Sequence, residues 1–306
     1  MSFKKSIGSL LRKILSERIY SLVANGFIIV PSFYKSIIKD ADKYFRYSLK
    51  ESPEKDVLLM RKYAHIIDKG LHRKDVSPGH SMVYYQLLKE TLNKLSVTPY
   101  KDDPTYKWAQ SKIKLYESLQ QSPETFTPLE GLNPSVQAVD YEDFVKLVQS
   151  RRSNRFFLEK KITDDVAFKL VSVSNWASSS CNKQPVKLFY TLNPELASEC
   201  LKCCKGGTGF SPFIPSFWVF AADSRGYVWP SEMMLPYIDV SLGAQNVYLA
   251  AQTLGITGTV LSWAQKSEEE DTQLRKLLSI PDEYVIVFCS VMGYASSTYM
   301  TPVRKY

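Results

Sequence analysis

One stretch that breaks regular structure divides this chain into two halves with different patterns. Residues 121–139 (QSPETFTPLEGLNPSVQAV) hold three prolines, a glycine and several small polar residues, a composition typical of a connection between domains. Before it, apolar residues recur at helical intervals, whereas after it helical and strand-like segments alternate. We therefore predict a mostly α-helical N-terminal region over residues 1–125, a linker over 126–139 and a second domain over 140–306.

The positive charge of the chain is concentrated at its start. The net charge is +8, yet residues 1–50 alone hold ten Lys or Arg against three acidic groups. The remainder is nearly neutral, which argues against a nucleic-acid enzyme with a basic groove through its body. Residues 3–20 have helical spacing with a basic face, so this helix either docks on the protein's own core or lies on an anionic membrane.

No segment near the N-terminus has the pattern of a membrane span or of a cleaved signal. The uncharged run over residues 19–34 is short and is interrupted by Asn25, Gly26 and Pro31. No small-residue cleavage site closes a clean apolar core. We expect a cytoplasmic protein, with peripheral membrane contact through residues 1–20 as the open alternative.

All three histidines lie in the helical half. His65, His72 and His80 fall within residues 55–120, and a metal or acid–base site is one interpretation of the segment that holds them. Because no carboxylate cluster completes a ligand set, structural histidines are the favoured interpretation. Gly70 is expected to end the first of these helices in a left-handed cap.

The five cysteines indicate reduced thiols rather than a metal centre. An odd number without a secretory signal is typical of a reducing compartment. Cys200, Cys203 and Cys204 are close in sequence, but no second cysteine pair or histidine follows at zinc-site spacing. We predict no metal.

The second half should form helices and strands in alternation. Asp140 is a candidate N-cap for a helix over 141–150. Thr163-Asp164-Asp165 opens the next helix with acidic residues in its first turn, where the helix dipole favours them. A long helix rich in Ala and Gly is expected over 236–254, ended by Gly255. The expected strands are residues 186–192, 217–222, 257–263 and 284–291.

An arginine-rich segment follows the helix over 141–150. Arg151, Arg152 and Arg155 surround Ser153, and guanidinium forks with a hydroxyl are groups that hold phosphate oxygens. Alone, the same pattern is common on a solvated helix end. The segment becomes informative only together with the rest of the chain.

Five motifs in this half together resemble the nitroreductase superfamily. They are the arginine segment 151–155, the stretch Ser179-Ser180-Cys181-Asn182-Lys183-Gln184-Pro185, the helix from Ile238 to Ile256, the Gly293-Tyr294 pair and the terminal Pro302-Val303-Arg304-Lys305. The resemblance covers about residues 140–306. It implies an α+β, three-layer fold with a central mixed or antiparallel sheet flanked by helices, FMN as cofactor and an intertwined homodimer.

The resemblance also assigns roles to individual residues. By carry-over, Arg151, Arg152 and Ser153, in the segment that ends at Arg155, hold the FMN phosphate and the pyrimidine edge, and Arg304 with Lys305 closes on the phosphate. Ser179, Ser180, Asn182 and Gln184 reach the flavin, in the family often from the partner subunit. Leu261 and Ser262 fall where the family makes main-chain contacts to the isoalloxazine. Asn and Gln amides both donate and accept, which suits the uracil-like edge of a flavin.

The implied function is an FMN-dependent oxidoreductase that works in two half-reactions. NAD(P)H would give hydride to flavin N5, and a nitro, quinone, enone or pathway-specific acceptor would then take the electrons. No catalytic side chain is expected, because the flavin carries the chemistry. The alternative is a flavin-fold scaffold recruited to a membrane or assembly through its basic N-terminal helix. Two features depart from the family: Ser178 stands where proline is common, and the first 140 residues have no counterpart in the family core.

Overall fold

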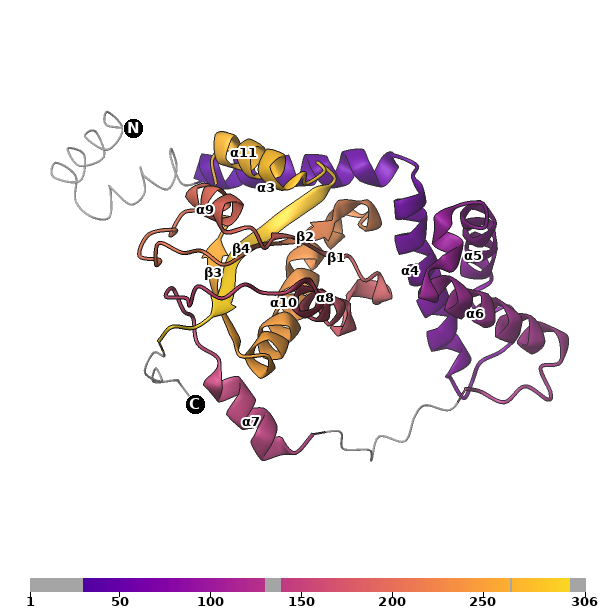
Figure 1. The fold of residues 1–306 in the computed structure, drawn as a ribbon. Helices are drawn as coiled ribbons and strands as arrows, with labels where there is room; N and C mark the ends of the chain where they lie inside the picture. Colours follow the sequence, from indigo (N-terminus) through magenta and orange to yellow (C-terminus); the bar gives the residue numbers. More distant parts are fainter. Residues whose placement is uncertain (1–29, 130–138, 265, 298–306) are drawn as a thin grey trace, which may run out of the picture.

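The sheet of the second half has helices on both faces, which confirms the expected α+β, three-layer fold (Figure 1). The computed structural model describes residues 30–129, 139–264 and 266–297. Four strands pair antiparallel throughout, in the order β1-β2-β4-β3. Their bounds are Val186–Thr191 for β1, Phe217–Asp223 for β2, Ile256–Ser262 for β3 and Tyr284–Tyr294 for β4.

Strand β2 is buried along its whole length because both faces of the sheet are covered. Phe217 and Val219 pack into the core under α9 (Pro194–Lys202) and α11 (Glu268–Leu278). Trp218 and Phe220 point the other way, into the core beneath α8 (Asp164–Ser172) and α10 (Leu235–Thr253). This alternation follows the two-residue period of a strand and gives the two separate cores of the domain.

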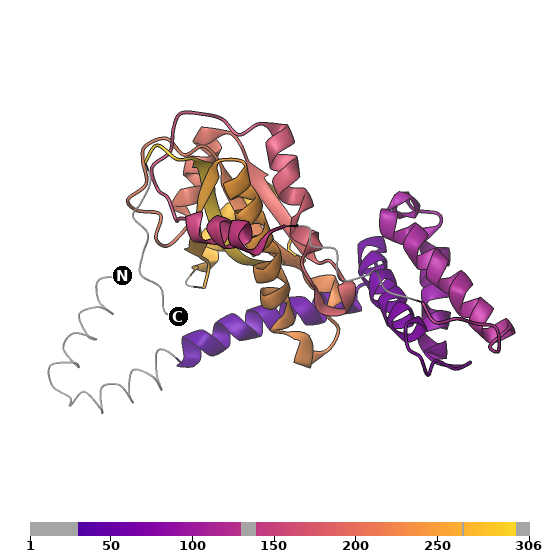
Figure 2. The same ribbon diagram turned by 90° about the horizontal axis from the view of Figure 1, so that it is seen from below.

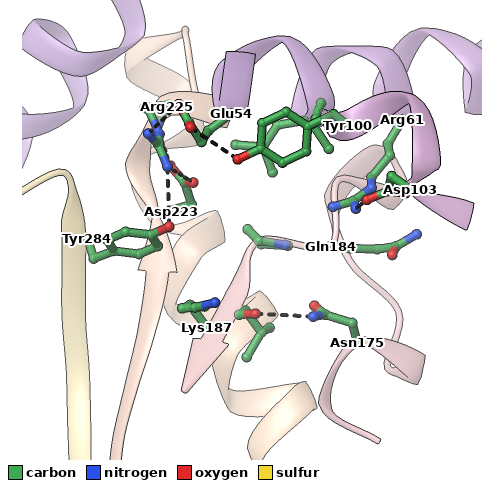
Figure 3. A pocket seen from close by; sticks show the side chains of 14 residues that line it. Glu54, Arg61, Tyr100, Asp103, Asn175, Gln184, Lys187, Asp223, Arg225 and Tyr284 are labelled. Atoms are coloured by element: carbon green, nitrogen blue, oxygen red, sulfur yellow. Dashed lines mark hydrogen bonds and ion pairs between the residues drawn. The ribbon is translucent and has the colours of Figure 1, made fainter. Parts of the chain in front are cut away.

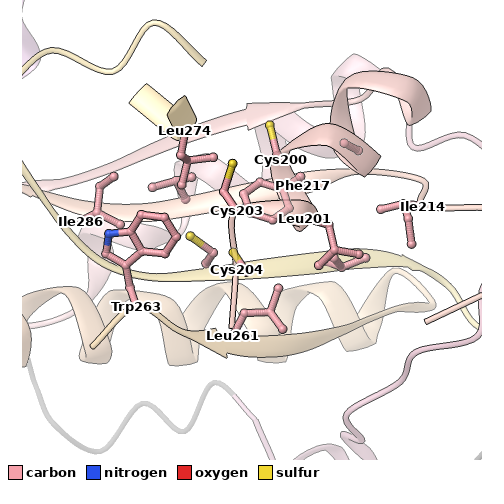
Figure 4. Packing of buried hydrophobic residues seen from close by; sticks show 14 of the residues in the cluster. Cys200, Leu201, Cys203, Cys204, Ile214, Phe217, Leu261, Trp263, Leu274 and Ile286 are labelled. Atoms are coloured by element: carbon pink, nitrogen blue, oxygen red, sulfur yellow. The ribbon is translucent and has the colours of Figure 1, made fainter. Parts of the chain in front are cut away.

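Four cysteines lie in the core beneath α9 and α11 (Figure 4). Cys200, Cys203, Cys204 and Cys289 are buried free thiols. Burial raises the pKa of Cys200 to about 12 and that of Cys203 to about 11, so these side chains stay protonated and pack as small apolar groups. Among the described residues, no group of three or more Cys, His, Asp or Glu is arranged to hold a metal ion.

The described part of the first half is helical, as predicted. It comprises α3 (Val30–Leu49), α4 (Pro53–Leu71), α5 (Met82–Leu95), the short 3-10 helix η2 (Pro99–Asp102) and α6 (Pro104–Gln121). Helices α4, α5 and α6 pack around their own core, which includes Met60, Ile67 and Leu95. We call these three helices with η2 the helical cluster, and Figure 2 shows it to one side of the sheet.

Helix α3 packs against the sheet domain rather than against the helical cluster alone. Tyr44 shares a small core with Tyr227 and Val285, and its ring meets that of Tyr227 edge-on, 6.1 Å between centroids. Lys43 forms an ion pair with Asp282 at 2.8 Å. The N-terminal extension therefore contributes directly to the packing of the second half. The expected helix over residues 3–20 and its membrane contact lie outside the described residues.

Most predicted helix ends are confirmed, and one is wrong. Asp140 and Thr163 cap α7 (Tyr141–Ser150) and α8 through their side chains, and Gly255 follows α10 with φ +70°. Gly70, however, lies within α4, which ends at Leu71 and whose C-cap residue His72 has a right-handed conformation. The absence of a side chain at Gly70 instead makes room for His80, whose ring atoms would lie 2.6 Å from a Cβ there.

None of the helices in the described ranges has the length and hydropathy that a membrane crossing requires.

Candidate functional site

The arginine segment leaves α7 in an extended conformation and is fixed to the sheet by Asn154. The Asn154 side chain is almost fully buried and donates from Nδ2 to the carbonyl of Ser297 at 3.1 Å. Its main-chain carbonyl accepts from the Thr259 hydroxyl of β3 at 2.5 Å. Asn154 was not among the predicted site residues, although it lies in the motif, because its role is to position its neighbours.

The four residues of this segment that were predicted to bind FMN differ in what their side chains contact. Within the described ranges, the side chains of Arg151 and Ser153 make no hydrogen bond or ion pair. Arg152 turns back and donates from Nη1 to the carbonyls of Gln149 and of Arg151, the latter at 2.7 Å, where a cation favours the C-terminal end of α7. The Arg155 guanidinium lies over the Phe210 ring at 5.8 Å. The segment therefore offers Arg151 and Ser153 to a ligand most directly.

The second predicted segment forms a tight loop with a strained backbone. Residues 179–184, which we call the amide loop, contain the 3-10 helix η4 (Ser180–Asn182) and follow another, η3 (Ser174–Trp176). Cys181, Asn182 and Gln184 all have positive φ, between 52° and 54°. That conformation costs roughly 1–2 kcal/mol for each residue other than glycine, so surrounding contacts must hold it.

The two serines of the amide loop shape the loop. The Ser179 hydroxyl accepts the N–H of Gln184 at 3.0 Å, and its carbonyl accepts the N–H of Asn182 at 2.9 Å. Ser180 donates its N–H and its hydroxyl to Asp239 of α10, each at 3.0 Å. Both hydroxyls are therefore already engaged. The amide side chains of Asn182 and Gln184 contact each other, with Nε2 of Gln184 donating to Oδ1 of Asn182 at 3.3 Å, and each keeps a further polar atom for a ligand.

Asp239 links the amide loop to the part of the domain that carries α3. It is buried, and its second carboxylate oxygen accepts the Tyr227 hydroxyl at 2.7 Å. Burial, reinforced by this carboxylate, holds the pKa of Tyr227 well above its usual range, so the phenol stays a donor. The Asp239 carboxylate thus accepts hydrogen bonds from the Tyr227 hydroxyl and from Ser180 of the amide loop.

A buried ion pair lies inside the amide loop. Lys183 is fully buried, and its Nζ lies 2.6 Å from Oε1 of Glu232, in the 3-10 helix η6 (Pro230–Glu232). The ammonium also lies over the Tyr227 ring, 4.5 Å from its centroid. Burial lowers the pKa of Lys183 despite this carboxylate, whereas the ammonium holds the pKa of Glu232 below 4.5 even though burial opposes this. We take the pair as ionised at neutral pH, because the contact is short and Glu232 accepts two further N–H groups.

The remaining predicted positions are placed less directly. Leu261 points into the core and is 3% exposed, so only its main chain is offered to a ligand. Ser262 is exposed at the end of β3, and its hydroxyl accepts from the N–H of Ala264 at 3.4 Å. Arg304 and Lys305 lie outside the described residues, and their phosphate role stays a prediction.

The two predicted segments do not meet within one chain. The arginine segment begins where α7 ends, at one end of the domain, whereas the amide loop lies between α8 and β1, beside α4 (Figures 1 and 2). Helix α10 and the sheet separate them in both views. Within one copy of the chain, the two predicted segments, which we call the two half-sites, therefore lie apart.

A polar cavity of about 230 Å³ lies behind the amide loop (Figure 3). The helical cluster contributes one wall, and β1 with the end of β2 contributes the other. At its top, Arg225 donates to Asp223 at 2.6 and 2.8 Å and to Glu54 of α4 at 3.2 Å. Gln184 lines the lower wall. Neither the cavity nor its ion pairs was predicted, because the two walls come from distant segments: Arg225 and Glu54, for example, are 171 residues apart in the sequence.

Comparison with known proteins identifies the second half. The family model described as the nitroreductase family matches residues 148–208 and 216–294. A putative NADH dehydrogenase/NAD(P)H nitroreductase of Archaeoglobus fulgidus is 29% identical over 153 residues, which are 50% of this chain and 86% of that protein. An oxygen-insensitive NADPH nitroreductase of Salmonella typhimurium is 25% identical over 159 residues, 49% of this chain and 65% of that protein.

Solved structures are similar over the same half. An FMN-dependent nitroreductase from Clostridium difficile superposes with a TM-score of 0.45 and 20% identity, over 52% of this chain and 91% of that one. The residues matched by the family model contain all four strands and the helices α8, α9, α10 and α11. This half of the chain, with its antiparallel sheet between two helical layers, is similar to the nitroreductase family.

Proposed function

We propose that this protein is an FMN-dependent oxidoreductase that takes hydride from NADH or NADPH and passes it to a small-molecule acceptor. The observation that carries the proposal is the pair of half-sites in a nitroreductase-like domain. One presents Arg151 and Ser153, whose side chains make no hydrogen bond or ion pair in the part of the chain that the structure describes. The other presents Asn182 and Gln184 on a strained loop that the Ser179 hydroxyl holds. Nitro, quinone and enone compounds, or a pathway-specific substrate, are the acceptor classes.

The donor groups fit the chemistry of FMN. A ribityl phosphate carries up to two negative charges, and Arg151 with the Ser153 hydroxyl offers charge and hydrogen bonds to it. Arg304 and Lys305 are proposed to add two cations. The amides of Asn182 and Gln184 both donate and accept, as the pyrimidine edge of a flavin requires. Leu261 and Ser262 are proposed to contact the ring through their main chain.

The chain's own residues bind and orient, and they need supply no nucleophile or base. When bound, FMN supplies the hydride chemistry at N5, alternately with the nicotinamide and with the acceptor. The three histidines all precede residue 81, and the buried thiols of Cys200 and Cys203 stay protonated because burial raises their pKa. Hydrogen bonds from the amide loop and the cations around the phosphate are proposed to tune the reactivity of the bound FMN.

A second copy of the chain is proposed to complete each site. The separation of the two half-sites within one chain supports this, and so does an apolar surface that the single chain leaves open. On α10, Ile238 and Leu242 are 52% and 46% exposed, one helical turn apart. On α7, which buries no residue, Tyr141, Phe144 and Val148 form a similar stripe. Exposed apolar stripes on two helices of a folded domain are the kind of surface that a protein–protein interface covers.

The proposal predicts stoichiometric flavin binding. The purified full-length protein should bind one FMN per chain, with visible absorption that is lost when NADH or NADPH is added without oxygen. Absorption should return when a quinone or a nitroaromatic compound is then supplied. A protein that takes up no FMN, or whose bound FMN neither nicotinamide reduces, would contradict the proposal; riboflavin, which lacks the phosphate, is the matched control ligand and should bind more weakly.

A further inference from the structure

We propose that Arg61, in the N-terminal helical cluster, is a positioning residue for the flavin site: it holds the amide loop in its strained conformation through the main-chain carbonyl of Lys183. The inference rests on the proposed function for its effect on FMN, but its effect on the loop is independent of it. It assigns a role to the part of the chain that the family match does not cover.

Arg61 is anchored within the helical cluster by two side-chain hydrogen bonds. It lies on α4, and its Nη2 donates to Oδ2 of Asp103 at 2.8 Å, while Nε donates to the Thr105 hydroxyl at 3.0 Å. Asp103 and Thr105 begin α6, where Asp103 is also the N-cap. The Arg61 side chain is only 15% exposed, so burial and these two hydrogen bonds fix the orientation of the guanidinium plane.

The remaining arm of the guanidinium reaches the amide loop. Nη1 donates to the carbonyl oxygen of Lys183 at 3.4 Å, a long contact that is reinforced by the charge of the donor. Figure 3 shows Arg61 and Asp103 on the helical side of the cavity, facing the strand side that carries Gln184. The accepting carbonyl lies between Asn182 and Gln184, two of the residues with positive φ.

The strained backbone of the amide loop requires contacts that hold its peptide units in place. Three residues in the left-handed region would relax if nothing held them, and the contacts from within the domain reach only parts of the loop. Ser180 is tied to Asp239, and the Lys183 side chain to Glu232. The Lys183 carbonyl has no partner in the described residues other than Arg61. Arg61 thus holds the carbonyl end of the peptide unit between Lys183 and Gln184, whose N–H end is held by the Ser179 hydroxyl at 3.0 Å.

The test compares Arg61→Ala with Arg73→Ala, which removes an exposed arginine just after α4 that pairs with Asp75. Amide hydrogen exchange is measured first without FMN. We expect exchange within residues 179–185 to accelerate about threefold to tenfold in Arg61→Ala, the change for one hydrogen bond of ordinary strength, and not in Arg73→Ala. Exchange in β2 and α10 should stay as in the wild type.

FMN binding is measured next. Arg61→Ala should raise the dissociation constant for FMN by a similar factor and shift the visible absorption bands of the bound flavin, because Asn182 and Gln184 are displaced. Arg73→Ala should do neither. Asp103→Asn, which keeps the N-cap but removes the charge that anchors Arg61, should have a smaller effect of the same sign and serves if Arg61→Ala does not fold.

The outcomes separate the two proposals. If loop exchange and FMN affinity in Arg61→Ala and Asp103→Asn equal those of the wild type, Arg61 is not a positioning residue. If the wild type binds no FMN yet loop exchange accelerates in Arg61→Ala, the positioning role stands and the flavin function fails. Acceleration spread over the whole domain, rather than confined to the loop, would also overturn the positioning role.

Discussion

Replacing Lys183 with methionine is expected to lower the free energy of unfolding by about 3–5 kcal/mol, because the substitution leaves the Glu232 carboxylate without its partner in a site that water hardly reaches. Lys183 is fully buried and Glu232 is 12% exposed in its side chain. The measurement is urea denaturation of the full-length protein at neutral pH. The matched control is Lys202→Met, whose ammonium pairs with Glu199 on the exposed surface and should change stability by less than about 1 kcal/mol.

Two further measurements test the origin of that loss. The double variant Lys183→Met with Glu232→Leu should recover much of the stability, because two apolar side chains replace a buried ion pair at little cost. Glu232 has a lowered pKa in the folded protein, so its contribution is fully present above about pH 4.5 and is lost as the pH falls through the folded pKa. Glu232→Gln should therefore show a weaker loss of stability in acid than the wild type. Equal stability of Lys183→Met and wild type would show that the pair is not buried as described.

Replacing Arg151 with alanine is expected to weaken FMN binding by about 1.5–3 kcal/mol, which is roughly tenfold to 150-fold in the dissociation constant. The physical reason is the loss of a charge-assisted hydrogen bond to the phosphate from a guanidinium that has no competing partner in the described residues. Riboflavin binding should change little. Replacing Arg151 and Arg304 together should cost more than either alone.

A second variant in the arginine segment serves as an internal comparison for Arg151→Ala. Arg155→Ala should weaken FMN binding less than Arg151→Ala, because the Arg155 guanidinium already lies over Phe210. Lys146→Ala, on the exposed surface of α7, is the control for a nearby lost charge. Unchanged flavin retention in Arg151→Ala, or an equal effect of Lys146→Ala, would place the phosphate elsewhere.

Much of the fold could be predicted because local signals and tertiary packing agree. Asp140, Thr163 and Gly255 stand where helix ends require them, and the β-strands have the expected apolar patterns. Helix α11 was not predicted, although Ser267 and Glu270 form a capping box at its start. The prediction for Gly70 was wrong because a glycine near a helix end can either form a left-handed cap or leave room for a neighbouring group. Here it leaves room for the His80 ring.

The candidate site was predictable in residue type but not in detail. The motifs indicate which side chains suit FMN, yet they do not show that Arg152 turns back onto α7 or that Ser180 donates to Asp239. The Ser180 contact depends on a residue 59 positions away in the sequence. The Arg152 contact depends on the path that the chain takes as it leaves α7. The link from Arg61 to Lys183 spans 122 residues and has no counterpart in the family motifs, so only the folded chain reveals it.

The most direct test of the account is whether two defective copies restore a flavin site together. One variant carries Arg151→Glu, and the other carries Asn182→Ala with Gln184→Ala; different affinity tags allow the mixed dimer to be purified. If each site takes its phosphate half from one subunit and its amide loop from the other, the mixed dimer has one intact site and should bind one FMN per two chains, whereas each parent binds none at the same concentration. A mixed dimer that binds no more FMN than its parents would contradict the account.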